Sequence, residues 1–231
     1  MREFWDDAAK RSAAYYVDTT LDFDNPDMDE FFATGRKIVD DGLARSPVRP
    51  AGRRLAVEIG SGLGRNCLAL LDHFDEVIGV DIAPEMVRQA QALVTDPRVS
   101  FRLGDGTTLT GVADATADYV LSFTVFQHIP DVAVIEGYIA EAGRVLRPGG
   151  VFSFQWNNQP GALLWRARRQ VLATLQRTGI HGELRGRNAA QFLGSKVPLR
   201  RIEAALHANG MEVAGTTGLG TLFAWCWARK G

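Results

Sequence analysis

Residues 55–65 read LAVEIGSGLGR, a short apolar strand pattern followed by three glycines and then by the start of a helical pattern. A strand that stops at glycines and turns into a helix leaves bare backbone at the carboxyl edge of a sheet, which is where open α/β sheets bind ligands. Glycine adopts dihedral angles closed to other residues and lets a ligand approach the backbone closely. Such loops also arise by chance, so the residues that follow decide the interpretation.

Strand and helix patterns alternate from residue 53 onward. The expected strands are 55–59, 77–80, 99–103, 119–123, 151–156, 211–216 and 222–228, and the expected helices among them are 66–74, 84–94, 132–146 and 199–208. Repeated strand–helix units with apolar strands indicate a parallel sheet covered by helices on both faces. The tight connection at Gly218 and Gly220 predicts that the last two strands pair antiparallel.

The composition is that of a globular cytoplasmic protein. Neither cysteine, Cys67 or Cys226, lies in a C-x-x-C or His-rich setting, which argues against a disulfide framework or a zinc site. The chain has no run of about 18 apolar residues, and its first residues lack the pattern of a signal peptide. The net charge of -1 argues against nucleic acid or an anionic membrane as the main partner.

Two segments outside the alternating pattern carry opposite charge. Residues 1–50 are acidic and aromatic, with two or three short helices broken near Asn25 and Pro26. They form either an amphipathic cover or a lid that faces a substrate. Residues 157–198 follow the fifth strand and contain seven basic residues against one acid. Arginines there would recognise a carboxylate or phosphate on a substrate, or else dock on the acidic N-terminal segment.

The acids that flank the glycine loop indicate which ligand it binds. Asp81 follows the loop by roughly 20 residues, the separation at which an acid accepts the hydroxyls of an adenosine ribose. Arg65 occupies the place of the last glycine in the dinucleotide-binding pattern, and Glu58 would repel a nearby phosphate. A ligand with positive charge and no phosphate suits these residues better than NAD does. S-adenosylmethionine carries an ammonium, a sulfonium and a ribose.

Four motifs in order then resemble one family. VEIGSGLG at 57–64, GVDIAPEM at 79–86, GDG at 104–106 and LRPGGVF at 146–152 are similar to motifs of the class I S-adenosylmethionine-dependent methyltransferases of small-molecule type. The resemblance covers residues 53–230 and implies a Rossmann-like, doubly wound, mostly parallel seven-stranded sheet with an antiparallel last strand. It divides the chain into an N-terminal helical cap or lid at 1–50 and a cofactor-binding domain at 51–231. The domain would include a helical, substrate-facing insert at 157–198.

The resemblance also implies a set of cofactor-binding residues. They are Glu58, Gly60, Ser61, Gly62, Gly64, Asp81, Ile82, Asp105, Gly106, Phe123 and Thr124. Glu58 and the glycine loop would hold the methionine part, and Asp81 would take the ribose hydroxyls. Ile82 would pack against the adenine, while Asp105 would accept a hydrogen bond from its amino group. The last two residues of the set would close the methionine end near the methyl group.

His128 is the candidate catalytic residue, because it follows the fourth strand at the sheet edge where the methyl group should emerge. An imidazole with a pKa near 6.5 suits proton abstraction at neutral pH. The alternative is a histidine that only caps or orients the next helix. The candidate substrate-binding residues are Trp5, Tyr15, Tyr16, Gln127, Trp156, Asn157 and Arg187. No cluster of metal ligands is visible in the sequence.

The function predicted from the sequence is methyl transfer from S-adenosylmethionine to an O or N acceptor on a small molecule, and the habit of the family suggests a role in specialised-metabolite biosynthesis. Residues 122–128 read SFTVFQH rather than N/D-P-P-Y/F, which argues against methylation of base amino groups. One alternative is a tRNA or protein methyltransferase that uses the arginine-rich insert. Others are an NAD-dependent oxidoreductase and a cofactor-binding module without catalysis.

Overall fold

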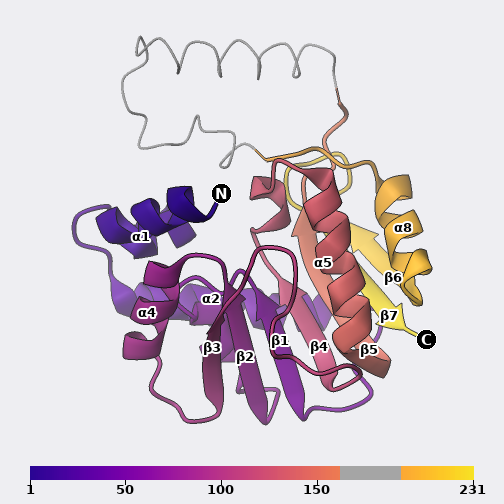
Figure 1. Cartoon of the computed structure of the whole chain (residues 1–231), viewed down its shortest axis with the longest axis horizontal. Coiled ribbons are helices and arrows are strands. Elements are labelled where there is room, and N and C mark those ends of the chain that lie inside the picture. The colour runs from indigo at the N-terminus through magenta and orange to yellow at the C-terminus, as the bar shows by residue number, and fades with distance from the viewer. Residues whose placement is uncertain (162–193) are drawn as a thin grey trace.

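A computed structural model of the chain describes residues 1–161 and 194–231, so Arg187 and most of the insert lie outside the described residues. The described strands form one seven-stranded sheet in the order β3-β2-β1-β4-β5-β7-β6 (Figure 1). Their bounds are β1 (Leu55–Ile59), β2 (Glu76–Asp81), β3 (Val99–Leu103), β4 (Ala117–Ser122), β5 (Leu146–Trp156), β6 (Met211–Thr217) and β7 (Ala224–Lys230). Pairing among β1 to β5 is parallel, and β7 is antiparallel to both β5 and β6. The predicted Rossmann-like sheet with an antiparallel last strand is confirmed.

The described helices follow the expected order with some changes of length. They are α1 (Arg2–Val17), α2 (Met28–Arg45), α3 (Arg65–Leu70), α4 (Pro84–Leu93), the short 3-10 helix η1 (Phe126–His128), α5 (Val132–Val145) and α8 (Leu199–Ala208). None of them is long and apolar enough to cross a membrane. The helix expected at 66–74 ends four residues early, at Leu70.

The fifth strand begins five residues earlier than residue 151, where the sequence placed it. Leu146 already pairs with Ala117 of β4, after which the register shifts. Gly149 has a φ of 78°, a conformation that glycine adopts without a steric penalty. Arg147 forms an ion pair with the buried Asp118 at 2.5 Å. The Arg-Pro-Gly-Gly stretch is therefore an irregular start of β5 rather than a loop.

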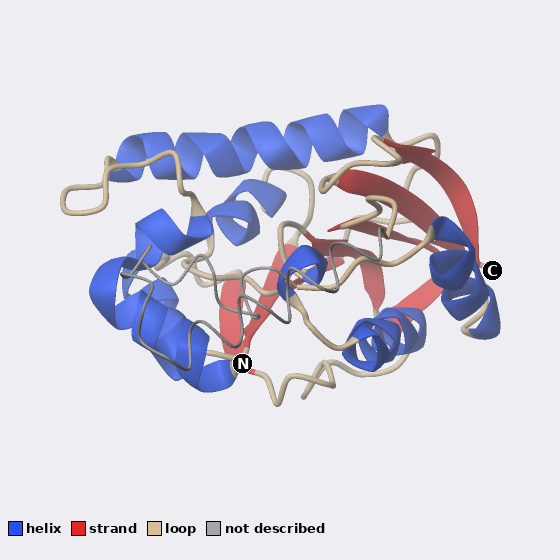
Figure 2. Ribbon diagram, turned by 90° about the horizontal axis from the view of Figure 1, so that it is seen from above, coloured by secondary structure: helices blue, strands red, loops and turns tan. Residues whose placement is uncertain are grey.

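The side chains of β1 alternate between two apolar layers, as the two faces of a strand require. Leu55, Val57 and Ile59 belong to the core that contains residues of α5 and α8. Ala56 belongs to the core that contains residues of α2, α3 and α4. Viewed from above, helices lie on both sides of the strands (Figure 2). The sheet is doubly wound, and its carboxyl edge remains open to receive the loops.

Helix α1 lies over that carboxyl edge (Figure 1). The Arg2 guanidinium donates to the carbonyl oxygen of Gly104 at 2.8 Å, next to the end of β3. An Asp6 carboxylate oxygen accepts from the backbone N–H of Glu85 at 2.8 Å, in the first turn of α4. Polar contacts at both places hold residues from the start of the chain against residues about 80 to 100 positions later.

Candidate functional site

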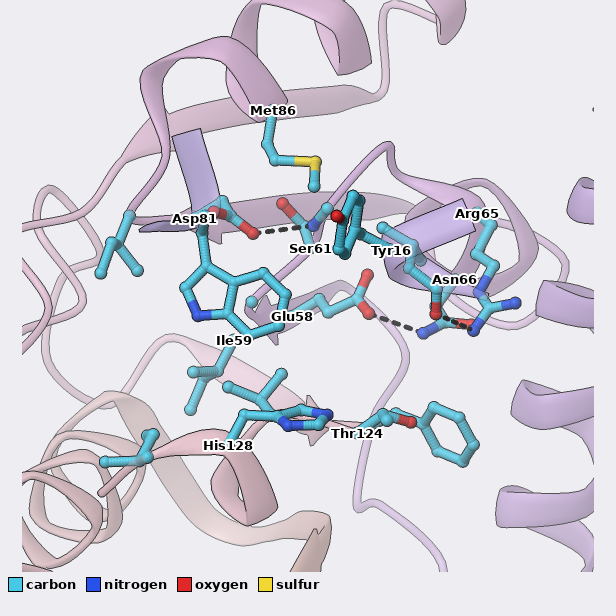
Figure 3. Close-up of a pocket in the computed structure, with 18 of the residues that line it drawn as sticks. Tyr16, Glu58, Ile59, Ser61, Arg65, Asn66, Asp81, Met86, Thr124 and His128 are labelled. Carbon is cyan, nitrogen blue, oxygen red and sulfur yellow. Dashed lines mark hydrogen bonds between the residues drawn. The ribbon is translucent and has the colours of Figure 1, made fainter. Parts of the chain in front are cut away.

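A cavity opens where β1, β2 and β4 end beneath α1 (Figure 3). It is lined by Met1, Trp5, Tyr16, Val17, Glu58, Ile59, Gly60, Ser61, Gly62, Arg65, Asn66, Asp81, Ile82, Met86, Phe123, Thr124, Val125, His128, Ile129 and Tyr138. In the close-up, Met86 and Asp81 lie on one side and His128 and Thr124 on the other. The ends of parallel strands meet at one edge of a sheet, so distant parts of the sequence contribute to one wall.

The glycine loop owes its shape to backbone conformations that other residues rarely adopt. Gly60 has a φ of 72°, and its N–H donates to Val80 O at 2.7 Å. A Cβ at this position would lie 2.4 Å from a methyl carbon of Val125. Gly62 has a φ of 51°, and its N–H donates to the Asp81 carboxylate at 2.9 Å. The glycines therefore let the loop fold tightly between β2 and the segment after β4.

Glu58 places a buried carboxylate at the base of the cavity. The residue is only 1% exposed. Asn66 Nδ2 donates to its Oε1 at 2.7 Å, and the Cys67 thiol donates to its Oε2 at 3.0 Å. Burial raises the pKa of Glu58 to about 7, although the hydrogen bonds from Cys67 and Asn66 and the charge of Arg65 oppose the rise. A positively charged ligand group beside the carboxylate would offset the free energy that burying its charge costs.

Asp81 links the end of β2 to the glycine loop. Its Oδ2 accepts from Gly62 N and its Oδ1 from Ala83 N, each at 2.9 Å. Burial raises the pKa of Asp81, while these backbone hydrogen bonds act in the opposite direction. Each carboxylate oxygen has further acceptor capacity. The side chain can therefore accept ligand hydroxyls while it holds the loop.

The opposite wall is formed after β4. Thr124 has a φ of 59°, a strained conformation for a residue other than glycine. Such strain is concentrated at functional sites. His128 ends η1, and its ring contacts the Trp5 ring edge-on with 5.5 Å between centroids. A titratable imidazole and an aromatic ring from α1 thus meet at this wall.

Most of the predicted cofactor-binding residues line the cavity, but three do not. Those that do are Glu58, Gly60, Ser61, Gly62, Asp81, Ile82, Phe123 and Thr124. Gly64, Asp105 and Gly106 are not among the lining residues. Asp105 is exposed, and one of its carboxylate oxygens accepts from the N–H groups of Thr107 and Thr108 at 2.8 and 2.7 Å. These hydrogen bonds hold the pKa of Asp105 well below its usual range.

The predicted catalytic and substrate-binding residues divide similarly. His128, Trp5 and Tyr16 line the cavity, whereas Tyr15, Gln127, Trp156 and Asn157 do not. Trp156 is buried in the core and donates to Val197 O at 2.9 Å. Asn157 is also buried, and its Oδ1 accepts from Gln159 N at 3.1 Å.

Three polar residues of the site were not singled out as binding residues from the sequence. Arg65 and Asn66 begin α3, and Tyr138 comes from α5. Arg65 is 5% exposed and Asn66 is 4% exposed. The sequence signal for the first two was that a pair of polar residues directly follows the glycine loop. The sheet topology buries the start of the helix at which they lie. Tyr138 falls on the apolar face of its helix, so nothing in the sequence distinguished it.

These residues fit a cofactor that has a cationic end and a ribose. The anionic side chains of the lining are Glu58 and Asp81, while Arg65 pairs with Asp18 at 2.5 Å. Ser61 Oγ, Asn66 Oδ1 and Arg65 Nε are buried side-chain atoms of the lining that have no hydrogen-bond partner among the described residues. A ligand with complementary donors and acceptors would satisfy them. In the described residues, no group of three His, Cys, Asp or Glu side chains could hold a metal ion.

Comparison with known proteins points in the same direction. Residues 57–154 match a family described as a methyltransferase domain. Trans-aconitate 2-methyltransferase from Methylobacterium radiotolerans is 32% identical over 134 residues, which are 57% of this chain and 48% of that relative. The chain thus spans about half the length of this curated relative.

Solved structures share the fold at low sequence identity. An S-adenosylmethionine-dependent methyltransferase from Mesorhizobium loti has a TM-score of 0.59 at 16% identity, covering 84% of this chain and 96% of that one. Magnesium protoporphyrin IX methyltransferase from Synechocystis PCC 6803, solved with bound S-adenosylhomocysteine (SAH), has a TM-score of 0.60 at 18% identity. That comparison covers 100% of this chain and 98% of the other.

Proposed function

We propose that the chain is a class I S-adenosylmethionine-dependent methyltransferase that transfers a methyl group from this cofactor to an O or N acceptor on a small molecule. The observation that carries the proposal is the pairing of Glu58 and Asp81 in one cavity whose opposite wall holds His128. Glu58 and the glycine loop would hold the methionine end. Asp81 would accept the ribose hydroxyls, and Ile82 would pack on the adenine.

The cofactor supplies an electrophilic methyl group attached to a sulfonium, which is already a good leaving group. The protein therefore has to place the acceptor atom in line and exclude water. Helix α1 would serve the second purpose, because its residues Trp5 and Tyr16 line the cavity. Thr124 and Phe123 form the wall beside which the acceptor would lie.

His128 is the proposed proton acceptor for a hydroxyl substrate. Its ring lies in the cavity wall against Trp5, and no other histidine lines the cavity in the described part of the chain. A positioned base contributes roughly 100-fold to 10,000-fold to the rate of such a reaction. An amine acceptor that is already neutral needs no base, so dependence on His128 distinguishes the two acceptor classes.

A small acceptor with a carboxylate is the first class to test. Trans-aconitate 2-methyltransferase is named for such an acceptor. The arginine-rich composition of residues 157–198 supports anionic substrates independently. A screen of small polycarboxylates, phenols and amines, with cofactor turnover as the signal, would identify the class.

The decisive test of the cofactor is a calorimetric titration of the purified protein with SAH, with NADH as the parallel control. Micromolar binding of SAH and none of NADH would support the proposal. Binding of NADH alone would overturn it. A 260/280 nm absorbance ratio that is raised by co-purified nucleic acid and falls with salt would instead favour an RNA substrate.

A further inference from the structure

Asn66 turns its amide toward Glu58 inside the cavity (Figure 3). Its Nδ2 donates to Glu58 Oε1 at 2.7 Å. An ionised carboxylate only accepts, and in this structure the amide nitrogen faces it, which leaves the carbonyl oxygen Oδ1 for another partner. This oxygen is buried and has no hydrogen-bond partner in the described part of the chain. A buried acceptor left unpaired costs free energy, and it therefore points to a ligand group that donates.

The surroundings of Oδ1 define the chemistry of that donor. The neighbouring Glu58 carboxylate is fixed by two donors, Asn66 and Cys67, and within residues 1–161 and 194–231 it forms no ion pair. Arg65 is close enough to lower the pKa of Glu58, yet its Nη1 is bonded to Asp18 and Thr34, and its buried Nε has no hydrogen-bond partner among the described residues. An alkylammonium has three N–H donors and one positive charge, so it can use both a neutral acceptor and a carboxylate. The Oδ1 atom only accepts and therefore requires a donor such as an ammonium, whereas the unpartnered Arg65 Nε only donates and suits the carboxylate of the same amino-acid end.

We propose that Asn66 is a specificity-determining residue that recognises the amino group of the cofactor. Its Oδ1 accepts a hydrogen bond from the ammonium of the amino-acid end, while its Nδ2 orients Glu58 to take the charge. This inference rests on the proposed function and deepens it. The cavity should therefore select ligands that keep the amino-acid end over those that have lost it.

The test compares two probes, SAH and 5′-methylthioadenosine, which lacks the amino-acid end. Each is titrated calorimetrically into the wild-type protein and into three variants, after melting curves have established that the variants fold. Asn66→Leu removes both the donor and the acceptor at nearly constant size. Asn66→Asp keeps an acceptor, because two adjacent carboxyl groups share one proton and the protonated one can still donate. Cys67→Ala is the matched control, since it removes the other hydrogen bond to Glu58 and leaves Oδ1 intact.

Asn66→Leu should weaken SAH binding by roughly 10-fold to 100-fold, the effect of losing a hydrogen bond to a charged group, and should leave 5′-methylthioadenosine within about twofold. Asn66→Asp should retain more SAH affinity than Asn66→Leu. Cys67→Ala should weaken SAH binding by less than Asn66→Leu does. An equal loss for both probes, no loss at all, or an equal effect of Cys67→Ala would overturn the inference while the proposed function stands. A wild-type protein that does not bind SAH would overturn both.

Discussion

The carboxylate of Glu58 should destabilise the protein in the absence of cofactor, and replacing it should reveal this. The side chain is 1% exposed, and burial raises its pKa from the ordinary 4.5 to about 7. The native state therefore binds more protons than the unfolded state between these two values, and stability falls as the pH rises through this window. A pKa difference of about 2.5 corresponds to roughly 3 kcal/mol. About 2.5 kcal/mol of that loss falls between pH 5 and pH 8.

Glu58→Gln removes the ionisation and nearly preserves the volume. We expect the free energy of unfolding of the variant, relative to wild type, to increase by about 2.5 kcal/mol from pH 5 to pH 8. The assay is urea denaturation of both proteins without cofactor at several pH values, because the difference cancels the titration of all other groups. The charged groups acting on Glu58 are Arg65, which lowers its pKa, and Asp81, which raises it.

Glu212→Gln, at an exposed position on β6, is the control and should show no such pH dependence. A difference between Glu58→Gln and wild type that stays constant from pH 5 to pH 8 would refute the reasoning. It would mean that the carboxylate titrates near its ordinary pKa despite its burial. The same variant should bind SAH more weakly, so that stability and affinity change in opposite directions.

Three further predictions concern other parts of the site. Asp81→Asn should weaken SAH binding by about 3 kcal/mol, roughly 100-fold, because the ribose hydroxyls lose a charged acceptor; calorimetry measures it, and unchanged affinity would remove this assignment. His128→Ala should lower turnover of a hydroxyl acceptor roughly 100-fold or more with little change in SAH affinity. The same change at the exposed His207 should have no effect. Asp18→Ala should lower the free energy of unfolding by about 3 kcal/mol in urea denaturation, because Arg65 then stays buried without its carboxylate partner. Asp24→Ala, at an exposed position, is the control, and an equal loss of stability in the two variants would contradict this prediction.

The sequence predicted the sheet well because local patterns determine it. Apolar runs bounded by acids and glycines gave the first and third strands at their observed bounds, Leu55–Ile59 and Val99–Leu103. Parallel topology then required Glu58 and Asp81 to reach the same edge, where the structure places them in one cavity. The early start of β5 was missed, because a Pro-Gly-Gly stretch looks like a turn and only its pairing with β4 makes it part of a strand.

The remaining site residues depend on contacts that sequence spacing does not reveal. Asn66 became visible only when its hydrogen bond to Glu58 and its unpaired oxygen could be seen together. Asp105 was expected to face the adenine, but its carboxylate accepts from Thr107 and Thr108, two and three residues further along the chain. Aspartate makes such local bonds to backbone two residues ahead in turns, so the Asp-Gly-Thr-Thr sequence already contained that signal.

Glu58 and Asp81 are both carboxylates with raised pKa values. Replacing each by its amide should nevertheless change the stability of the protein differently. The partners of Glu58 are side chains, and the Asn66 amide can turn over to meet a glutamine. The partners of Asp81 are the backbone N–H groups of Gly62 and Ala83, which cannot exchange donor for acceptor. An asparagine at position 81 presents an NH2 group to one of these donors and leaves it unsatisfied. We therefore expect Glu58→Gln to affect mainly ligand binding and Asp81→Asn to disturb the glycine loop as well.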